Sequence, residues 1–280
     1  MLPLAHWPAE QRRRITGVFT DIDDTLTTEG AITAEALQAL ADLKAAGLAV
    51  LPITGRHIGW CVPLMDGGST VPWPADAMVA ENGALALIPK PETASPYSSH
   101  PSSHTRRQLA KLYQQDAATR AAHQARMEQV AAKVLAEVPG ALRARDVGGR
   151  ETDLAFDYNE HTQLPPEAVQ QILAILQGAG MYTTVSSIHI HGCFDDFNKW
   201  RGARWIVREL YGRDLTQELD RWVFVGDSGN DQPMFQHFTH SVGVANIRRF
   251  EAQLQHKPRY ITQGERGAGF AELVRALLRP

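Results

Sequence analysis

The chain has 280 residues, 44% of them hydrophobic, and a formal net charge of −3. This length holds one large domain or two ordinary ones, and the near-neutral charge gives no reason to expect nucleic acid or an anionic membrane as partner. Cys61 and Cys193 have no close spacing that indicates a metal site, so a reducing, cytoplasmic setting is expected. No apolar run is long enough for a membrane span, and the N-terminal basic cluster follows the short apolar stretch, the reverse of a secretion signal. These features predict a soluble protein.

The first predicted strand ends in a cluster of carboxylates. Residues 18–28 read Val-Phe-Thr-Asp-Ile-Asp-Asp-Thr-Leu-Thr-Thr, and their apolar start is typical of a buried strand in a parallel sheet. Asp21 and Asp23 are two residues apart on an extended backbone, so their side chains leave the same face. Two carboxylates this close repel each other unless a cation lies between them, and Mg2+ suits a site that also binds phosphate. An acidic turn that caps a helix, with Asp24 or Thr25 as the N-cap, explains the same residues.

The segment that follows alternates between helix and strand. Leucines at helical spacing predict a helix over 34–46, which Gly47 ends. A second apolar strand is predicted over 48–53, and a hydroxyl, a glycine and a cation follow it at Thr54, Gly55 and Arg56. The next predicted elements are a short helix near 57–65 and strands over 77–80 and 84–88.

The pattern changes between residues 89 and 190. Residues 89–104 are rich in Pro, Ser and His, as expected of a linker or surface loop. The elements predicted after it are a polar helix over 105–137, a hairpin of strands 142–147 and 152–158, a helix over 165–177 and a strand over 182–190, with another strand at 189–193. This order predicts an inserted α+β domain with an antiparallel sheet.

From Lys199 the parallel pattern resumes. The predicted elements are helix 199–211, strand 222–225, helix 231–237, strand 241–244, helix 248–255, strand 259–261 and helix 267–278. The predicted fold class is therefore α/β, with a Rossmann-like parallel-sheet core, helices on both of its faces, and an inserted α+β cap. Residues 1–88 and 191–280 form the core, and residues 89–190 form the cap.

Four segments in chain order resemble the signature motifs of the haloacid dehalogenase superfamily. They are the Asp pair at 21 and 23, Thr54 at the second strand end, Lys199 ahead of a helix, and Gly-Asp-Ser-Gly-Asn-Asp over 226–231. Each motif is weak by itself, and the four in order are specific. An insert between the second and third motifs resembles the type II cap, and its αββαββ order resembles subclass IIB. Phosphatases of sucrose phosphate, trehalose phosphate and mannosyl-3-phosphoglycerate belong to that subclass.

The resemblance implies a Mg2+-dependent phosphohydrolase of a small phosphomonoester, above all a sugar phosphate. It makes Asp21 the nucleophile that forms an aspartyl-phosphate, and Asp23 the general acid and base. Thr54 and Lys199 complete the catalytic set. The substrate-binding residues that it implies are Thr54, Gly55, Arg56, Asn82 and Lys199. The metal site that it implies contains Asp21, Asp23 through its backbone carbonyl, Asp227, Asn230 and Asp231.

Several alternatives remain open at this point. Asn230 and Asp231 would contact the metal through water, orient Lys199 or cap the next helix, and Arg56 would bind phosphate or form a salt bridge. Asp24 stands where the superfamily commonly has glycine.

In the cap, His189 and His191 alternate on a strand and are expected to line the substrate cleft rather than to form a metal pair. Arg143, Arg145 and Arg150 either bind a second anionic group or are solvated. A phosphomutase with the same aspartyl-phosphate chemistry, related to phosphomannomutases, and a non-catalytic binding protein are the rival functions. The oligomeric state, monomer or dimer, is not determined by the sequence.

Overall fold

The core of the molecule is a six-stranded parallel sheet with the strand order β1-β15-β14-β13-β2-β5. The computed structural model describes residues 1–68, 71–91, 106–145 and 147–279. The strands in that order are β1 (Leu2–Pro3), β15 (Tyr260–Ile261), β14 (His240–Gly243), β13 (Trp222–Gly226), β2 (Gly17–Thr20) and β5 (Ala49–Pro52). Because all neighbours are parallel, the carboxyl ends of β13, β2 and β5 meet at one edge of the sheet.

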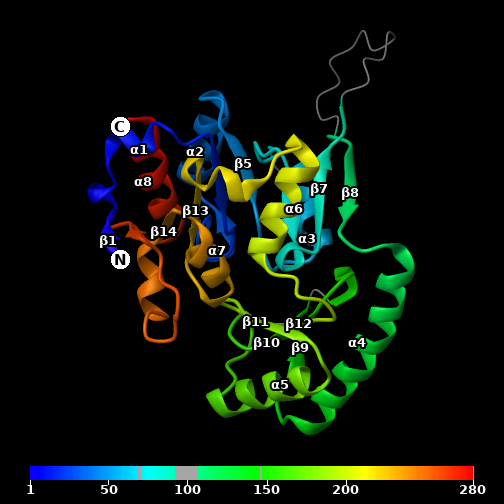
Figure 1. Cartoon of the computed structure of the whole chain (residues 1–280). Helices are drawn as coiled ribbons and strands as arrows, with labels where there is room; N and C mark the ends of the chain where they lie inside the picture. Colours follow the sequence, from blue (N-terminus) through cyan, green and yellow to red (C-terminus); the bar gives the residue numbers. More distant parts are fainter. Residues whose placement is uncertain (69–70, 92–105, 146, 280) are drawn as a thin grey trace.

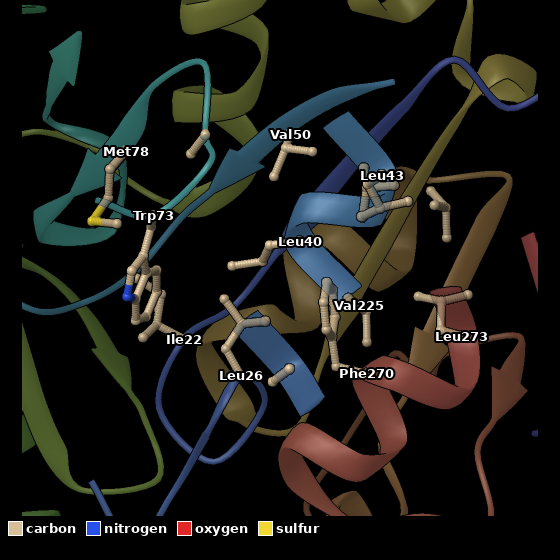
Figure 2. Packing of buried hydrophobic residues seen from close by; sticks show 14 of the residues in the cluster. Ile22, Leu26, Leu40, Leu43, Val50, Trp73, Met78, Val225, Phe270 and Leu273 are labelled. Atoms are coloured by element: carbon tan, nitrogen blue, oxygen red, sulfur yellow. The ribbon is translucent and has the colours of Figure 1, made fainter. Parts of the chain in front are cut away.

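Helices cover both faces of this sheet, as predicted. Successive residues of β2 enter opposite layers, with Val18 in one hydrophobic cluster and Phe19 in the other. The first layer holds α2 (Ala34–Ala45), α3 (Ile58–Asp66) and α8 (Arg266–Leu278), and the second holds α6 (Lys199–Tyr211) and α7 (Gln232–His237). Figure 2 shows the first layer, where leucines of α2 pack with Phe270 of α8 against the sheet. A strand that is buried on both faces explains the continuous apolar runs in the sequence.

A second, antiparallel sheet extends the core and corrects one prediction. It joins β6 (Met78–Ala80), β7 (Leu85–Pro89) and β8 (Leu109–Tyr113). The helix predicted over 105–137 was wrong in its first part, because β8 pairs with β7 and α4 begins only at Ala117 (Ala117–Glu137). The Asp116 side chain accepts a hydrogen bond from the backbone N–H of Thr119 and so fixes that start. Most of the linker predicted over 89–104 lies outside the described residues.

The cap contains a four-stranded antiparallel sheet with the strand order β11-β12-β10-β9. Its strands are β9 (Leu142–Arg143), β10 (Leu154–Asp157), β11 (Tyr182–Val185) and β12 (His189–Cys193). Helices α4 and α5 (Pro166–Gly178) pack on one face of the sheet, around Phe156, Ile172 and Ile190. The alternation along β12 then turns His189 and His191 to the other face of the sheet. That face lies toward the core (Figure 1). The run predicted as one strand over 182–190 is two strands with a turn at 186–188.

The remaining described elements are short. They are α1 (Ala9–Arg12), the hairpin strands β3 (Thr27–Thr28) and β4 (Ala31–Ile32), and single turns of 3-10 helix at Leu4–His6, Glu81–Gly83, Val147–Gly149, Leu215–Gln217, Leu219–Arg221, Gly229–Asp231 and Ala245–Arg249. The helix predicted over 248–255 is wrong, since a 3-10 turn ends at Arg249 and turns without helix follow. No helix in the described ranges is both long and apolar enough to cross a membrane.

Candidate active site

Side chains from three strand ends converge at the carboxyl edge of the core sheet. Asp21 follows β2, Thr54 lies just beyond β5, and Asp227 follows β13. The parallel ladder sets this arrangement, because the backbone N–H of Asp21 still donates to the carbonyl of Val225 on β13, at 2.9 Å. All three side chains are buried. Ligand sites of open α/β sheets occur at this edge.

Lys199 forms the positive centre of this group. It is the first residue of α6, it is fully buried, and its ammonium donates to Asp21 Oδ1 and, at 2.7 Å, to Asp231 Oδ1. Burial alone would lower the pKa of this lysine, but the two carboxylates outweigh burial and raise it. The other oxygen of Asp231 accepts N–H bonds from Asp227 and Ser228, at 2.8 and 3.0 Å. Asp231 therefore orients both Lys199 and the fourth-motif loop, residues 226–231.

The position of Lys199 depends on a contact between two glycines. A Cβ atom added at Gly202 of α6 would lie 2.5 Å from the Cα of Gly83, and one added at Gly83 would lie 2.6 Å from the carbonyl oxygen of Asn198. No flexible side chain is involved, so neither backbone has room for a methyl group. This close packing fixes the first turn of α6, and with it the lysine.

The residues at this edge fit a divalent cation. Carboxylate oxygens of Asp21, Asp227 and Asp231 lie within 4.8 Å of one another, and all three residues are buried. Burial, only partly offset by Lys199, raises the pKa of Asp21 to about 7, and burial and the neighbouring carboxylates raise that of Asp227 well above its ordinary value. Asp231 accepts three hydrogen bonds, whereas each oxygen of Asp227 accepts one from the described residues, from Thr25 or Asn246, and Asp21 accepts from Lys199 through Oδ1, so Asp21 and Asp227 have more capacity left for a cation. A hard ion with oxygen ligands suits this donor set.

Asp23 faces Arg56 rather than the carboxylate group. The Arg56 guanidinium donates to both oxygens of Asp23, at 3.0 to 3.1 Å, and pairs with Glu160 of the cap at 2.7 Å. His189 contacts the other oxygen of Glu160 at 2.8 Å. Burial acts to raise the pKa of Glu160, but the contacts with His189 and Arg56 outweigh it and lower that pKa to about 2. A chain of charged groups therefore links the core to the cap at this site.

The loop that follows β5, residues 54–56, lies directly under the cap. A Cβ atom at Gly55 would come within 2.9 Å of His191 Nε2 and 3.3 Å of Asn82 Nδ2, so a larger residue here would have to displace these side chains. The Thr54 hydroxyl oxygen accepts the N–H of Arg56 at 3.0 Å. Asn82 accepts a hydrogen bond from the Asn230 amide at 3.0 Å. The structure thus brings Thr54, Gly55 and Asn82 together, and it turns the Asn230 side chain toward Asn82.

The cap closes over the carboxylates. Asp21, Asp23, Gly55, Arg56 and Asn230 from the core, and the segment 186–189 with His191 from the cap, enclose a cavity of about 10 Å³. Arg150 is buried, pairs with Asp153 at 2.9 Å and donates to the carbonyl of Gly55 at 3.0 Å, and Asp153 contacts His191. A space of this size holds about one water molecule. The structure therefore represents a closed form of the site.

Two of the cap arginines considered from sequence lie away from this cavity. Arg143 pairs with Glu128 of α4 at 2.7 Å, and Arg145 is exposed. Only Arg150 of the three reaches the site, and it contacts protein groups there.

Comparisons with known proteins agree with this architecture. The family model of haloacid dehalogenase-like hydrolases matches residues 18–130, and no curated protein matches the sequence. A Thermoplasma acidophilum protein superposes with a TM-score of 0.65 at 17% identity, covering 94% of this chain and 98% of its own. The sucrose-phosphatase of Synechocystis, solved with sucrose and phosphate, gives 0.64 at 14% identity and covers 95% and 98%.

An Aspergillus fumigatus trehalose-6-phosphate phosphatase gives a TM-score of 0.54 at 17% identity and covers 97% of this chain and 96% of its own. At these identities the superpositions show the fold alone. Residues 18–130 are similar to the haloacid dehalogenase-like hydrolases. The order of elements in the core and the cap agrees with the fold of a subclass IIB sugar phosphatase, which superposes with a TM-score of 0.57 at 14% identity.

The backbone conformation at residue 24 explains why Asp is tolerated there. Its φ of 56° lies in the left-handed region, where glycine is favoured and Asp is tolerated. Its carboxylate forms an ion pair with Arg266 at 2.9 Å and so points away from Asp21. The Asn246 amide donates to the Asp24 carbonyl and to Asp227 Oδ2, which ties the two loops together.

Sequence reasoning missed three residues of this site. Glu160 and Asp153 come from the cap, and Asn246 follows β14. Each acts through a neighbour that is distant in the chain, so no local pattern marks it. A signal was present only for Asn246, which lies just past a predicted strand end, where site residues of such sheets collect.

Proposed function

We propose that this protein is a Mg2+-dependent phosphatase of sugar phosphates that works through an aspartyl-phosphate. The observation that carries the proposal is the buried Lys199, which pairs with Asp21 and Asp231 at the carboxyl edge of the sheet. Asp227 is the third carboxylate of this group. Such a group has one free carboxylate oxygen to attack phosphorus and fixed cations for the phosphoryl oxygens. The family match supports a hydrolase, and the sugar phosphatases among the structures of the same fold support the substrate class.

In the first step, an Asp21 oxygen forms a bond to phosphorus as the bond to the leaving oxygen breaks. Asp23 gives its proton to that leaving alkoxide and becomes a carboxylate. In the second step, Asp23 takes a proton from water, the hydroxide attacks phosphorus, and inorganic phosphate leaves with Asp21 regenerated. Lys199 neutralises the charge on the phosphoryl oxygens in both steps, and the Thr54 hydroxyl and the Gly55 backbone line the phosphate.

Arg56 has two roles in this scheme. In the closed form without substrate it neutralises Asp23 and Glu160. An incoming phosphate dianion offers Arg56 a stronger partner, so we expect the guanidinium to move from Asp23 to the phosphoryl oxygens. That movement frees Asp23 to carry the proton that the leaving group needs.

Asp21 and Asp227 are the side chains that would hold Mg2+, with the backbone carbonyl of Asp23 as a further oxygen. When bound, the ion screens the charge of the phosphate against that of the attacking carboxylate. Asp231 and Asn230 then act as positioning residues, Asp231 on Lys199 and Asn230 on Asn82.

We further propose that residues 89–190 act as the substrate-selecting cap over a core of residues 1–88 and 191–280. The cap contributes His189 and His191 to the enclosed cavity and pairs Glu160 with Arg56 of the core. β8 is the part of the insert that is paired with the core sheet, at β7. A cavity of about 10 Å³ admits no sugar, so the cap must open for substrate.

The test is phosphate release from a panel of sugar phosphates, with Mg2+, with EDTA, and with the variant Asp21→Asn. We expect release that requires Mg2+ and that falls at least a thousandfold in the variant. Lys133→Met, at an exposed position of α4, serves as the control and should leave release unchanged. Release that persists in Asp21→Asn would refute the assigned nucleophile, and no release from any ester would refute the function.

A further inference from the structure

A second concave site lies on α6, the helix that begins at Lys199 and is yellow in Figure 1. It is a cavity of about 490 Å³, bounded by α6, the loop of residues 212–214 that follows it, and Gln114 just after β8. None of its described lining residues also lines the cavity at Asp21. Pockets of this size bind small molecules. The core therefore has room for a ligand at a place that the proposed catalysis does not use.

The lining of this cavity is strongly positive. Four arginines line it, namely Arg201, Arg204, Arg208 and Arg213. Among the described residues that line it, the one carboxylate is Asp214, and its Oδ1 already accepts hydrogen bonds from the N–H and the hydroxyl of Thr216, at 3.0 and 2.8 Å. Four guanidinium groups against one carboxylate leave an excess of positive charge, in a chain whose net charge is −3. Such a local field concentrates anions at the cavity.

Two of these arginines are held in place by carboxylates. Arg201 pairs with Asp195 at 2.7 Å and also with Asp196, and Arg213 pairs with Glu218. A guanidinium group has five N–H donors, so these pairs leave donors over for a ligand. The pairs also restrict the two side chains, which lowers the entropy that is lost when a ligand binds.

The other two arginines are exposed and have no ionic partner. Within the described ranges, neither Arg204 nor Arg208 pairs with a carboxylate, although the Arg204 guanidinium lies 5.7 Å from the centroid of the Trp200 ring. The two arginines are four positions apart on α6, where side chains are neighbours and like charges repel. The helix dipole favours a cation in the last turn, which accounts for Arg208 but not for Arg204. A bound anion would replace this repulsion with attraction.

The spacing of the arginines indicates the length of the anion. Arg201, Arg204 and Arg208 lie at positions i, i+3 and i+7, on one face of α6. With a rise of 1.5 Å per residue they extend over about 10 Å of the helix axis. One phosphate or carboxylate group contacts part of this row, whereas a chain of two or three phosphates contacts all of it. Guanidinium groups bind phosphate oxygens through paired N–H bonds, so each arginine can take one phosphate of the chain.

We propose that this cavity binds the polyphosphate chain of a small molecule, at a site separate from that at Asp21. A nucleoside polyphosphate and free inorganic polyphosphate share this chain. Arg204 and Arg208 bind it with their unpaired guanidinium groups. Trp205 is more than nine-tenths buried and lines the same cavity, and within the described part of the chain its indole N–H has no hydrogen-bond partner, so it is a further donor. The volume of the cavity and the net charge of −3 disfavour a nucleic acid as the ligand.

Isothermal titration calorimetry of the whole protein in EDTA tests this site without any need for catalysis. The probes are tripolyphosphate, ATP, inorganic phosphate and citrate. We expect tripolyphosphate to bind at least tenfold more tightly than phosphate or citrate, and to lose affinity as the ionic strength rises. Arg204→Ala and Arg208→Ala should each raise the Kd for tripolyphosphate by roughly 5- to 30-fold. This lies at the low end for a lost hydrogen bond to a charged group, because both side chains are exposed.

Two control variants locate the binding. Arg275→Ala, at an exposed position of α8, and Arg56→Ala, in the cavity at Asp21, should leave the Kd for tripolyphosphate within about twofold. If ATP binds at least tenfold more tightly than tripolyphosphate, with the same dependence on Arg204 and Arg208, the ligand is a nucleotide, and a smaller difference identifies the phosphate chain alone.

Four results would overturn the proposal. They are the absence of saturable binding, a Kd that is unchanged in both Arg204→Ala and Arg208→Ala, a loss of binding in Arg56→Ala as large as in these two variants, and citrate binding as tight as that of tripolyphosphate. An oligonucleotide that binds more tightly than ATP through the same arginines would show that the partner is a nucleic acid and not a small molecule. None of these results depends on whether the protein hydrolyses a sugar phosphate.

Discussion

The variant Gly229→Ala tests whether the closed form seen here is the form that works. Gly229 lies in the fourth-motif loop, and a Cβ atom there would lie 2.8 Å from the Val185 carbonyl oxygen at the end of β11 in the cap. Ordinary contact begins near 3.4 Å, so the cap strand must retreat by about 0.6 Å. Neither partner is a flexible side chain, and the Gly229 backbone has no positive φ, so the effect is one of space alone.

Overpacking of this kind costs about 1 to 3 kcal/mol. The cap can relieve the strain by lifting, so the cost falls on the closed form and leaves the separate hydrophobic layers of core and cap intact. If only the closed form reacts, kcat/KM for a sugar phosphate falls by roughly 5- to 150-fold. The midpoint of thermal unfolding should change by no more than about 2 °C, because the free energy of unfolding from the open form is unchanged.

The assay is steady-state phosphate release together with thermal unfolding, and Gly178→Ala is the matched control. Gly178 ends α5 of the cap, has no positive φ, and a Cβ atom there meets nothing within 4 Å. A kcat/KM for Gly229→Ala within twofold of the wild type would refute the reasoning, because catalysis would then not need this contact. A large loss of thermal stability would show instead that the strain spreads through the fold.

Three further predictions concern stability. Burial raises the pKa of Glu81 to about 7, so the carboxyl of the folded protein keeps a proton that the unfolded chain loses near pH 4.5. The free energy of unfolding of the wild type therefore falls as pH rises between these values, and urea unfolding should show Glu81→Gln gaining about 3 kcal/mol relative to the wild type from pH 4 to pH 8. A difference in unfolding free energy between the two proteins that does not change with pH would contradict this. Lys199→Met leaves two buried carboxylates without their cation and should lose about 3 to 5 kcal/mol without Mg2+, whereas Lys133→Met should lose less than about 0.5. Asp24→Gly should stay within about 1 kcal/mol of the wild type, since relief of the positive φ offsets the lost ion pair, while Asp24→Ala loses about 1 to 2 in chemical unfolding. Equal effects of the last two variants would rule out the backbone argument.

Much of the core was predictable because its signals are local. A buried parallel strand needs apolar residues on both faces, and β2, β5 and β13 each show such a run directly before their polar ends. Parallel pairing then brings these ends to one edge, whatever the length of the intervening chain. Placing Asp21, Thr54 and Asp227 together therefore required only the order of elements.

The errors lie where a distant partner decides the local structure. Residues 109–113 read as the start of a helix, yet they form β8 because β7 offers a free edge for pairing. The turn at 186–188 interrupts an apparently continuous strand, because the backbone and hydroxyl of Ser186 bond to His189 and reverse the chain. The intrinsic secondary-structure propensity of a short segment is weaker than such tertiary contacts and does not decide its structure.

The sequence by itself determined the alternating core and the carboxylates at the strand ends, because each depends on spacing along the chain. Only the tertiary structure decided which groups these carboxylates meet. It placed Arg56 on Asp23 and Glu160, paired Asp231 with Lys199, and brought Gly229 against Val185. The physical reason is that these contacts join residues from 32 to 104 positions apart in the chain, and no local pattern records their approach.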